Sequence, residues 1–131
     1  MAKILIVDDE PAVVQLMCFI LERVGHTVTQ AFNGQEALKV LGVAPVNPEA
    51  PLPDLILLDV MMPIVDGYTV AITLKNDPRA SVVPLLVITA KSDMRNMFSA
   101  LPNVKAFFNK PFDPKSLREA VAKIVAAQPP A

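Results

Sequence analysis

The sequence contains very few of the residues that cysteine- or histidine-based chemistry requires. Its 131 residues include one cysteine, one histidine and no tryptophan. The lone Cys18 excludes an internal disulfide and a metal site built from several cysteines. Its apolar surroundings favour a small buried side chain over a reactive thiol. His26 follows Gly25 in a predicted turn, where we expect neither a catalytic nor a metal-binding role.

An excess of charge and long apolar runs are missing as well. Twelve basic and 13 acidic residues give a net charge of −1, which argues against binding nucleic acid or an anionic membrane through a basic patch. No apolar run approaches the roughly 20 residues that span a bilayer, and the first residues, MAKILIVDDEP, lack the features of a signal peptide. We therefore expect a cytoplasmic protein with no membrane insertion, in which residues 1–127 form one domain and residues 128–131 a disordered tail or truncated linker.

Short apolar runs that stop at a polar residue recur along the chain. Residues 4–7, 55–58 and 85–88 are continuous apolar runs, which is typical of strands buried on both faces of a parallel sheet. Weaker runs at 27–29 and 106–108 predict two further strands, the first of them at an edge of the sheet.

Helical patterns separate these runs. They predict helices over residues 11–24, 35–41, 68–75, 93–100 and 114–127. The alternation of strands and helices predicts an α/β sandwich with a parallel sheet and helices on both of its faces.

The first predicted helix is apolar on more than one side. One stripe is expected to face the core and consists of Val13, Leu16, Met17, Ile20, Leu21 and Val24. Val14, Cys18 and Phe19 lie away from this stripe, and either a partner surface or burial against neighbouring elements would explain them.

Four of the predicted strands end in polar side chains. Asp8 and Asp9 follow the first strand, Asp59 follows the third, and Thr89 and Lys110 follow the last two. The carboxyl ends of parallel strands share one edge, where ligands bind, so we expect these side chains to gather there. Three neighbouring carboxylates repel one another and favour a cation, and an oxygen-rich site suits Mg²⁺. Asp59 is the best candidate for a nucleophile that takes a phosphoryl group, with Lys110 and Thr89 stabilising the phosphoryl oxygens.

Six segments with workable spacing are similar to the receiver domain of response regulators in two-component signalling, in particular to chemotaxis-type regulators. They are ILIVDDEP at 4–11, NGQEAL at 33–38, PDLILLDVMMPIVDGY at 53–68, LKNDP at 74–78, PLLVITA at 84–90 and NKPFDPKSL at 109–117. The resemblance covers about residues 3–127. It implies a flavodoxin-like, three-layer sandwich with a five-stranded parallel sheet in the order 2-1-3-4-5 and five helices.

The resemblance also implies a role for particular residues. Asp59 would accept a phosphoryl group from a phosphohistidine of a sensor histidine kinase or a histidine phosphotransfer protein. Asp9 and Asp59 would coordinate Mg²⁺, with Asp8 acting through water and the backbone carbonyl of Met61 as the third protein ligand. Lys110 would contact the phosphoryl oxygens.

Further positions match the family pattern around this site. Thr89 would move to hydrogen-bond a phosphoryl oxygen, and Phe107 stands at the aromatic switch position. The Lys110–Pro111 bond is expected to be cis. Pro63, Asp66 and Gly67 match the turn after the acceptor, where glycine is expected to allow a backbone geometry that side chains resist.

The chain departs from the family pattern in four places. Phe107 stands where Tyr is more common, Met61 and Lys91 flank the acceptor, and two longer stretches differ. The proline-rich loop at 42–53 is longer than usual. We expect it to range from ordered to flexible and to lie away from the site. Asn103–Val104–Lys105 replaces the usual Gly-Ala-Asp, next to the short fourth helix. Because the fourth helix and the last strand usually form the output face in this family, this departure leaves partner choice and dimer mode open.

The resemblance implies a switch that acts by binding. Phosphorylation would change the affinity for a downstream target protein or output domain through the fourth helix, the last strand and the last helix, with no direct contact to nucleic acid. We expect no enzyme beyond self-catalysed phosphorylation and dephosphorylation. An aspartate-nucleophile phosphatase would need a second Asp where Met61 stands, and nucleotide-binding GxGxxG or Walker-type loops are absent. The other alternative is a receiver-like module that binds its partners without phosphorylation.

Overall fold

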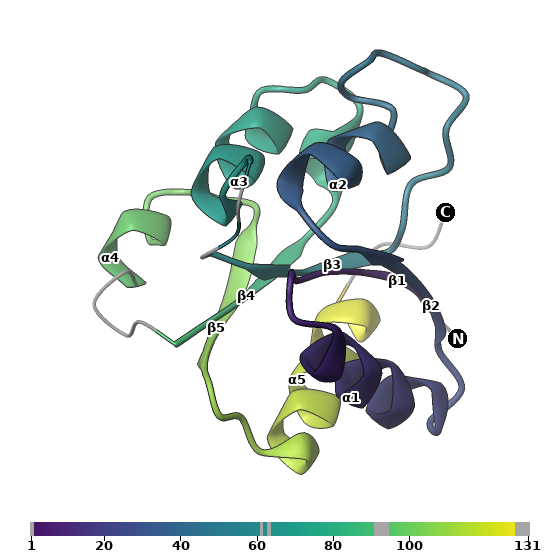
Figure 1. Cartoon of the computed structure of the whole chain (residues 1–131), viewed down its shortest axis with the longest axis vertical. Helices are drawn as coiled ribbons and strands as arrows, with labels where there is room; N and C mark the ends of the chain where they lie inside the picture. Colours follow the sequence, from purple (N-terminus) through teal and green to yellow (C-terminus); the bar gives the residue numbers. More distant parts are fainter. Residues whose placement is uncertain (1, 61, 63, 91–94, 128–131) are drawn as a thin grey trace.

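The computed structural model describes residues 2–60, 62, 64–90 and 95–127, and its centre is a parallel five-stranded sheet (Figure 1). The strands are β1 (Lys3–Val7), β2 (Thr27–Ala31), β3 (Leu55–Asp59), β4 (Leu85–Thr89) and β5 (Val104–Asn109). Their order is β2-β1-β3-β4-β5. The expected fold class and strand order are therefore confirmed.

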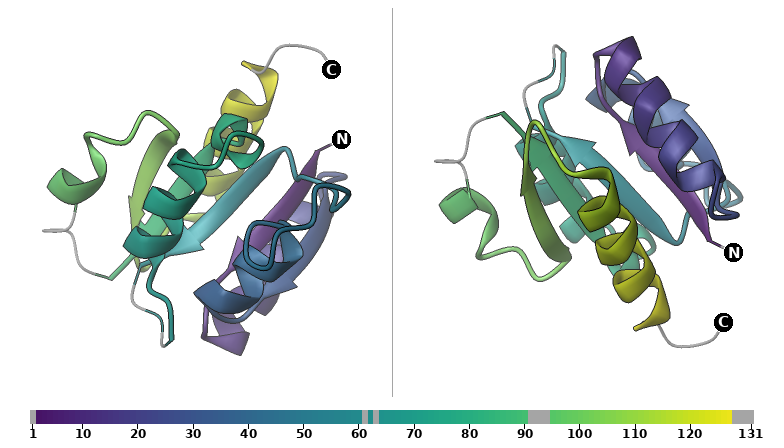
Figure 2. Two further views of the ribbon diagram at one scale, coloured as in Figure 1. Left: turned by 90° about the horizontal axis from the view of Figure 1, so that it is seen from above. Right: turned by 90° about the horizontal axis from the view of Figure 1, so that it is seen from below.

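Helices cover both faces of this sheet (Figure 2). One face carries α1 (Pro11–Glu22) and α5 (Pro114–Ala126). The other carries α2 (Gly34–Val40), α3 (Gly67–Lys75) and α4 (Arg95–Phe98). A short 3₁₀ helix, η1 (Ala80–Val82), precedes β4. The fourth helix ends at Phe98, two residues before the predicted end at residue 100. Its expected start at Asp93 and the predicted tail at 128–131 lie outside the described residues.

The ends of the helices follow from local sequence. Asn33, Asp66 and Asp113 precede α2, α3 and α5, and each side chain accepts a hydrogen bond from the backbone N–H three residues later. Such caps satisfy backbone donors that have no partner inside the helix. Pro11 and Pro114 occupy first-turn positions, where a missing N–H costs nothing.

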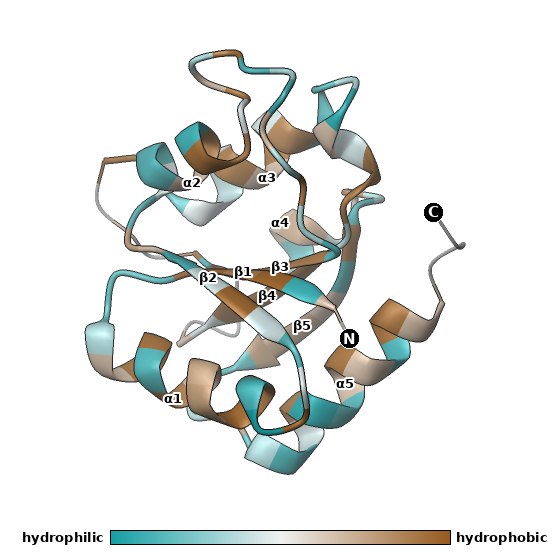
Figure 3. Ribbon diagram, turned by 90° about the vertical axis from the view of Figure 1, so that its right-hand side faces the viewer, coloured by the Kyte–Doolittle hydropathy of each residue, from teal (hydrophilic) through white to brown (hydrophobic). Residues whose placement is uncertain are grey.

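Two apolar cores fill the spaces on either side of the sheet. In β3, Ile56 and Leu58 face the core beneath α2, α3 and α4, whereas Leu55 and Leu57 face the core beneath α1 and α5. Every residue of β3 and β4 is buried, as the continuous apolar runs predicted. In Figure 3 the central strands are largely coloured as apolar, whereas the helices carry both apolar and polar segments.

The predicted core stripe of α1 is partly wrong. Val14 and Cys18, which were placed off the stripe, are 1% and 7% exposed, whereas Leu16 is 48% exposed. Val14, Met17, Cys18 and Leu21 follow the same three- and four-residue spacing as the predicted stripe, so spacing alone could not choose between the two. Contact with the sheet and with α5 decides which side is covered, and it leaves Leu16 and Phe19 outside.

The long loop between α2 and β3 is tied to the body of the protein. The guanidinium of Arg79, which precedes η1, donates hydrogen bonds to the carbonyl oxygens of Leu41, at 3.0 Å, and of Ala50. The Asn47 N–H donates to the Gly42 carbonyl at 2.8 Å. The loop therefore has fixed points at both ends, although Val46 is almost fully exposed.

Within the described residues, no helix combines the length and the apolar character that a bilayer crossing requires.

Candidate functional site

The carboxyl edge of the sheet brings the predicted polar residues together. Asp8 directly follows β1, Asp59 ends β3, Thr89 ends β4 and Lys110 directly follows β5. Because β1, β3, β4 and β5 are consecutive neighbours in one parallel sheet, all four strand ends lie at the same edge. The side chains that the sequence predicted for one site thus share that edge.

Lys110 is the electrostatic centre of this site. Its Nζ lies 2.9 Å from Asp8 Oδ2, 2.9 Å from Glu10 Oε1 and 3.6 Å from Asp59 Oδ1. Burial on its own would lower the pKa of Lys110, but the hydrogen bonds to Glu10 and Asp8 and the negative charge of Asp59 outweigh it and raise that pKa. The ammonium group therefore stays charged and is a fixed cation beside two buried carboxylates.

Asp59 has a strongly perturbed acidity. Its side chain is almost completely buried, and its pKa is raised to about 7, first by burial and then by the charge of Asp8, against the attraction of Lys110. Burial also raises the pKa of Asp8, although the Glu10 backbone N–H donates to its Oδ1 at 2.9 Å. Both pKa shifts mean that ionisation of these carboxyl groups is unfavourable in the folded protein. A further cation in the site would stabilise their ionised forms.

The three residues directly after β1 supply a group of oxygens that suits such a cation. One carboxylate oxygen each from Asp8, Asp9 and Glu10 lies within 4.8 Å of the others. Oxygen ligands of this kind are those that Mg²⁺ and other hard divalent cations prefer. Met61, whose carbonyl was predicted as the third protein ligand, lies outside the described residues.

The turn after Asp59 needs glycine for a different reason from the one predicted. Gly67 does not have a positive φ; in this turn that geometry belongs to Ile64, at 71°. Space is what Gly67 provides, because a Cβ there would overlap the Asp59 carbonyl oxygen and lie 2.7 Å from the Val60 Cα. The Gly67 N–H also donates to the Val60 carbonyl at 2.9 Å. Pro63, the other predicted turn residue, lies outside the described residues.

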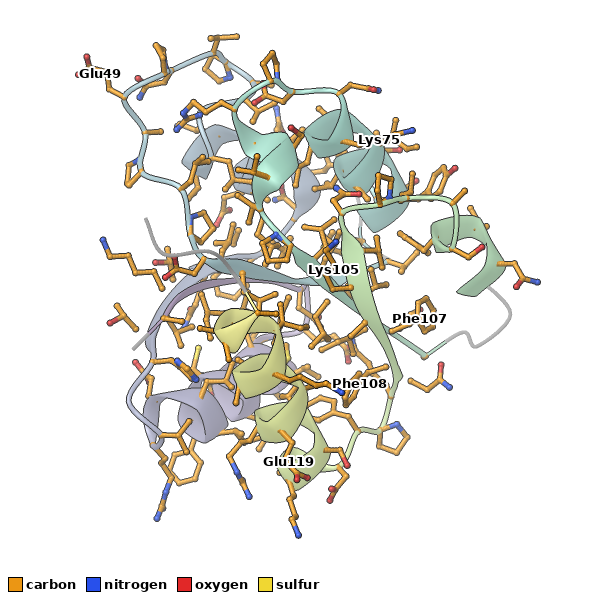
Figure 4. All side chains as sticks on the ribbon, turned by 180° about the vertical axis from the view of Figure 1, so that it is seen from behind. Glu49, Lys75, Lys105, Phe107, Phe108 and Glu119 are labelled. Atoms are coloured by element: carbon orange, nitrogen blue, oxygen red, sulfur yellow. The ribbon has the colours of Figure 1, made fainter. Side chains whose placement is uncertain are left out.

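The predicted switch residues lie beside the site. Thr89 is fully buried, and its carbonyl accepts a hydrogen bond of 2.8 Å from the Lys110 N–H. Phe107 points from β5 toward α4, while the neighbouring Phe108 points toward α5 (Figure 4). The Phe107 ring centroid is 6.0 Å from that of Phe98 in α4. The Lys110–Pro111 peptide bond is cis.

Sequence reasoning missed one member of this site. Glu10 stands at the N-cap of α1, yet its side chain makes no capping hydrogen bond and contacts Lys110 instead. The signal in the sequence was the third acid of the run Asp8–Asp9–Glu10. Because its partner is 100 residues away, no local pattern could reveal the contact.

A family comparison agrees with this geometry. The model of the response regulator receiver domain matches residues 4–122. The chain belongs to this family. Response regulator receiver domains are signalling proteins of two-component systems rather than enzymes in the usual sense.

Relatives of this receiver domain differ in length. RpaA of Synechocystis sp., described as a DNA-binding dual master transcriptional regulator, is 35% identical over 127 residues, which is 96% of this chain and 48% of RpaA. PilH of Pseudomonas aeruginosa is 31% identical over 127 residues, covering 96% of this chain and 99% of PilH. The chain spans about half the length of the first curated relatives it matches.

A solved structure supports the same assignment. The response regulator TrrA of Thermotoga maritima, crystallised in complex with Mg²⁺ and BeF, has a TM-score of 0.79 and 31% identity. The match covers 95% of this chain and 99% of TrrA.

Proposed function

We propose that this receiver domain is a phosphorylation-dependent signalling switch in which Asp59 accepts a phosphoryl group from a phosphohistidine of a sensor histidine kinase or phosphotransfer protein. The observation that carries the proposal is the buried Asp59 carboxylate 3.6 Å from the Lys110 ammonium, at the edge where Asp8 and Asp9 also lie. We expect this phosphoryl transfer to take place in the cytoplasm.

The chemistry follows from the charges around the acceptor. An Asp59 carboxylate oxygen attacks phosphorus, the phosphorus–nitrogen bond to the donor imidazole breaks, and an aspartyl phosphate remains. Lys110 contributes a fixed positive charge to the phosphoryl oxygens, and the Thr89 hydroxyl would donate to one of them. Asp8, Asp9 and Asp59, with the Met61 carbonyl that the family pattern adds, would hold Mg²⁺. The bound ion would neutralise phosphoryl charge and favour the ionised nucleophile.

Intact mass after incubation with acetyl phosphate tests this proposal. The wild-type protein is expected to gain one phosphoryl group only when Mg²⁺ is present, and Asp59→Ala is expected to gain none, because the nucleophile is gone. Glu49→Ala, which removes an exposed carboxylate in the long loop, should behave like the wild type. A wild-type protein that gains no mass although it binds Mg²⁺ would contradict the proposal and favour a phosphorylation-independent binding module.

We assign the docking of the phosphodonor to a groove between α1 and α5. Leu16 and Phe19 are 48% and 59% exposed on α1, and the Arg23 guanidinium lies 5.3 Å from the centroid of the Phe19 ring. The groove has a volume of about 570 Å³ and is lined by Leu16, Phe19, Ile20, Arg23, Val24, Pro114 and Arg118. An exposed aromatic ring flanked by arginines suits a helix that presents apolar and acidic side chains.

Phe19→Glu is expected to separate the two kinds of donor. It should slow phosphotransfer from a phosphorylated histidine kinase at least about tenfold, since it places a charge where an aromatic contact is needed. Phosphorylation by acetyl phosphate, which needs no docking surface, should keep the wild-type rate. Val46→Glu is the matched control, because Val46 is 82% exposed in the long loop. An equal loss with both donors, or no loss with either, would argue against this surface.

The output surface is proposed around α4, β5 and α5. Phe107 connects the site to this region through its contact with Phe98 of α4. We propose that phosphorylation changes the affinity of this surface for a downstream target protein or output domain, without direct contact between this domain and nucleic acid.

A further inference from the structure

The Lys110 ammonium is shared unevenly among its carboxylate neighbours. Nζ makes contacts of 2.9 Å with Asp8 and with Glu10, but it lies 3.6 Å from the nearest oxygen of Asp59. Asp8 is held in place by burial and by a hydrogen bond from the turn. Glu10 is 59% exposed at its side chain, so it is the partner that can leave without burying an unpaired charge.

Helix capping does not explain the direction of the Glu10 side chain. Glu10 occupies the N-cap of α1, a position where Ser, Thr, Asp or Asn would accept a hydrogen bond from the first turn. The Glu10 side chain makes no such bond and reaches instead across the site to a residue 100 positions later. An exposed glutamate extended in this way loses side-chain freedom, and what it gains is the contact with Lys110.

We propose that Glu10 is a positioning residue that holds the Lys110 ammonium away from Asp59 before phosphorylation and thereby slows modification of the acceptor. The inference rests on the proposed function of Asp59. When phosphoryl oxygens enter the site, Lys110 exchanges the Glu10 carboxylate for them and Glu10 turns to solvent. Both side chains remain charged throughout, so the exchange needs no proton transfer and no further reactant.

Two substitutions separate the contact from the charge of Glu10. Glu10→Gln weakens the contact, because a neutral amide holds an ammonium less strongly than a carboxylate does, but it also removes a charge that repels anionic donors. Glu10→Asp keeps the charge and is one methylene shorter, so it loses the 2.9 Å contact. We expect both variants to be phosphorylated by acetyl phosphate about two- to fivefold faster than the wild type, the range typical of an exposed ion pair. If charge alone matters, Glu10→Asp will keep the wild-type rate, and the inference is overturned.

A second measurement needs neither Mg²⁺ nor a phosphodonor. Hydrogen exchange of the Lys110 ammonium, followed by ¹⁵N NMR, should be at least about twofold faster in both variants, because exposed partners shield the ammonium only while they are in contact. If the wild type is phosphorylated at Asp59 and both variants match its phosphorylation rate and its Lys110 hydrogen-exchange rate, the inference about Glu10 is overturned, but the proposed function of Asp59 is not. A wild type that acetyl phosphate does not modify overturns the proposed function and this inference together.

Discussion

Asp59→Asn is expected to make the Mg²⁺-free protein more stable at pH 8 by about 3 kcal/mol. Folding raises the pKa of Asp59 from 3.8 to about 7, through burial and the charge of Asp8. At about 1.36 kcal/mol for each pKa unit, ionisation of Asp59 destabilises the folded state by roughly 4 kcal/mol above pH 7. Asparagine is neutral, like protonated Asp59, and avoids this cost. The pKa of about 7 already includes the attraction of Lys110, so the smaller figure allows only for hydrogen bonds that an amide makes differently from a protonated carboxyl.

The pH dependence fixes the sign of this effect. Between about pH 4 and pH 7 the folded state binds a proton at Asp59 that the unfolded state has released, so wild-type stability falls as the pH rises. The stabilising contribution of protonated Asp59 is complete below pH 3.8 and is lost as the pH rises through about 7. Most of the difference in free energy of unfolding between Asp59→Asn and the wild type should therefore disappear when the pH is lowered from 8 to 5.

Urea unfolding with a chelator present, at pH 5 and at pH 8, measures the difference in free energy of unfolding between Asp59→Asn and the wild type at each pH. Asp66→Asn is the matched control, because Asp66 caps α3 through its side-chain oxygen and asparagine caps a helix equally well. The control should change the free energy of unfolding by less than about 0.5 kcal/mol. Parallel wild-type and Asp59→Asn stabilities across this range would show that the acceptor is not strained by its neighbours.

The strands of this fold were predictable because each central one carries its own signal. β3 and β4 are covered on both faces, so every position must be apolar, and the run itself identifies the strand. The site then followed from topology, since parallel strands deliver their last residues to one edge. The order of the strands came from the family resemblance, because an apolar run does not indicate which other strand it pairs with.

Features that depend on distant partners were not predictable from local patterns. The spacing in α1 allowed two stripes, and contact with the sheet and α5 chose the one that buries Cys18 and exposes Leu16. The role of Glu10 depends on Lys110, which arrives from β5 at the other side of the site. The explanation offered for Gly67 failed in the same way, because the atom that excludes a side chain belongs to β3 rather than to the turn itself.

Gly67→Ala is therefore expected to cost about 3 kcal/mol of stability, at the upper end for overpacking a filled space. The atoms that an added Cβ would meet are the carbonyl of Asp59 and the Cα of Val60, and both belong to the backbone. A flexible side chain could move aside, but these atoms can yield only if the end of β3 and the first turn of α3 separate. Because Asp59 lies on that strand end, the rate of phosphorylation by acetyl phosphate should fall as well.

Urea unfolding of Gly67→Ala beside Lys75→Ala tests this argument. Lys75 is exposed in the last turn of the same helix, so its replacement should change stability by less than about 0.5 kcal/mol. If Gly67→Ala lowers the free energy of unfolding and slows phosphorylation of Asp59 while Lys75→Ala does neither, the contact between α3 and β3 positions the acceptor. If Gly67→Ala unfolds like the wild type, this contact is not rigid and cannot be what holds Asp59 in place.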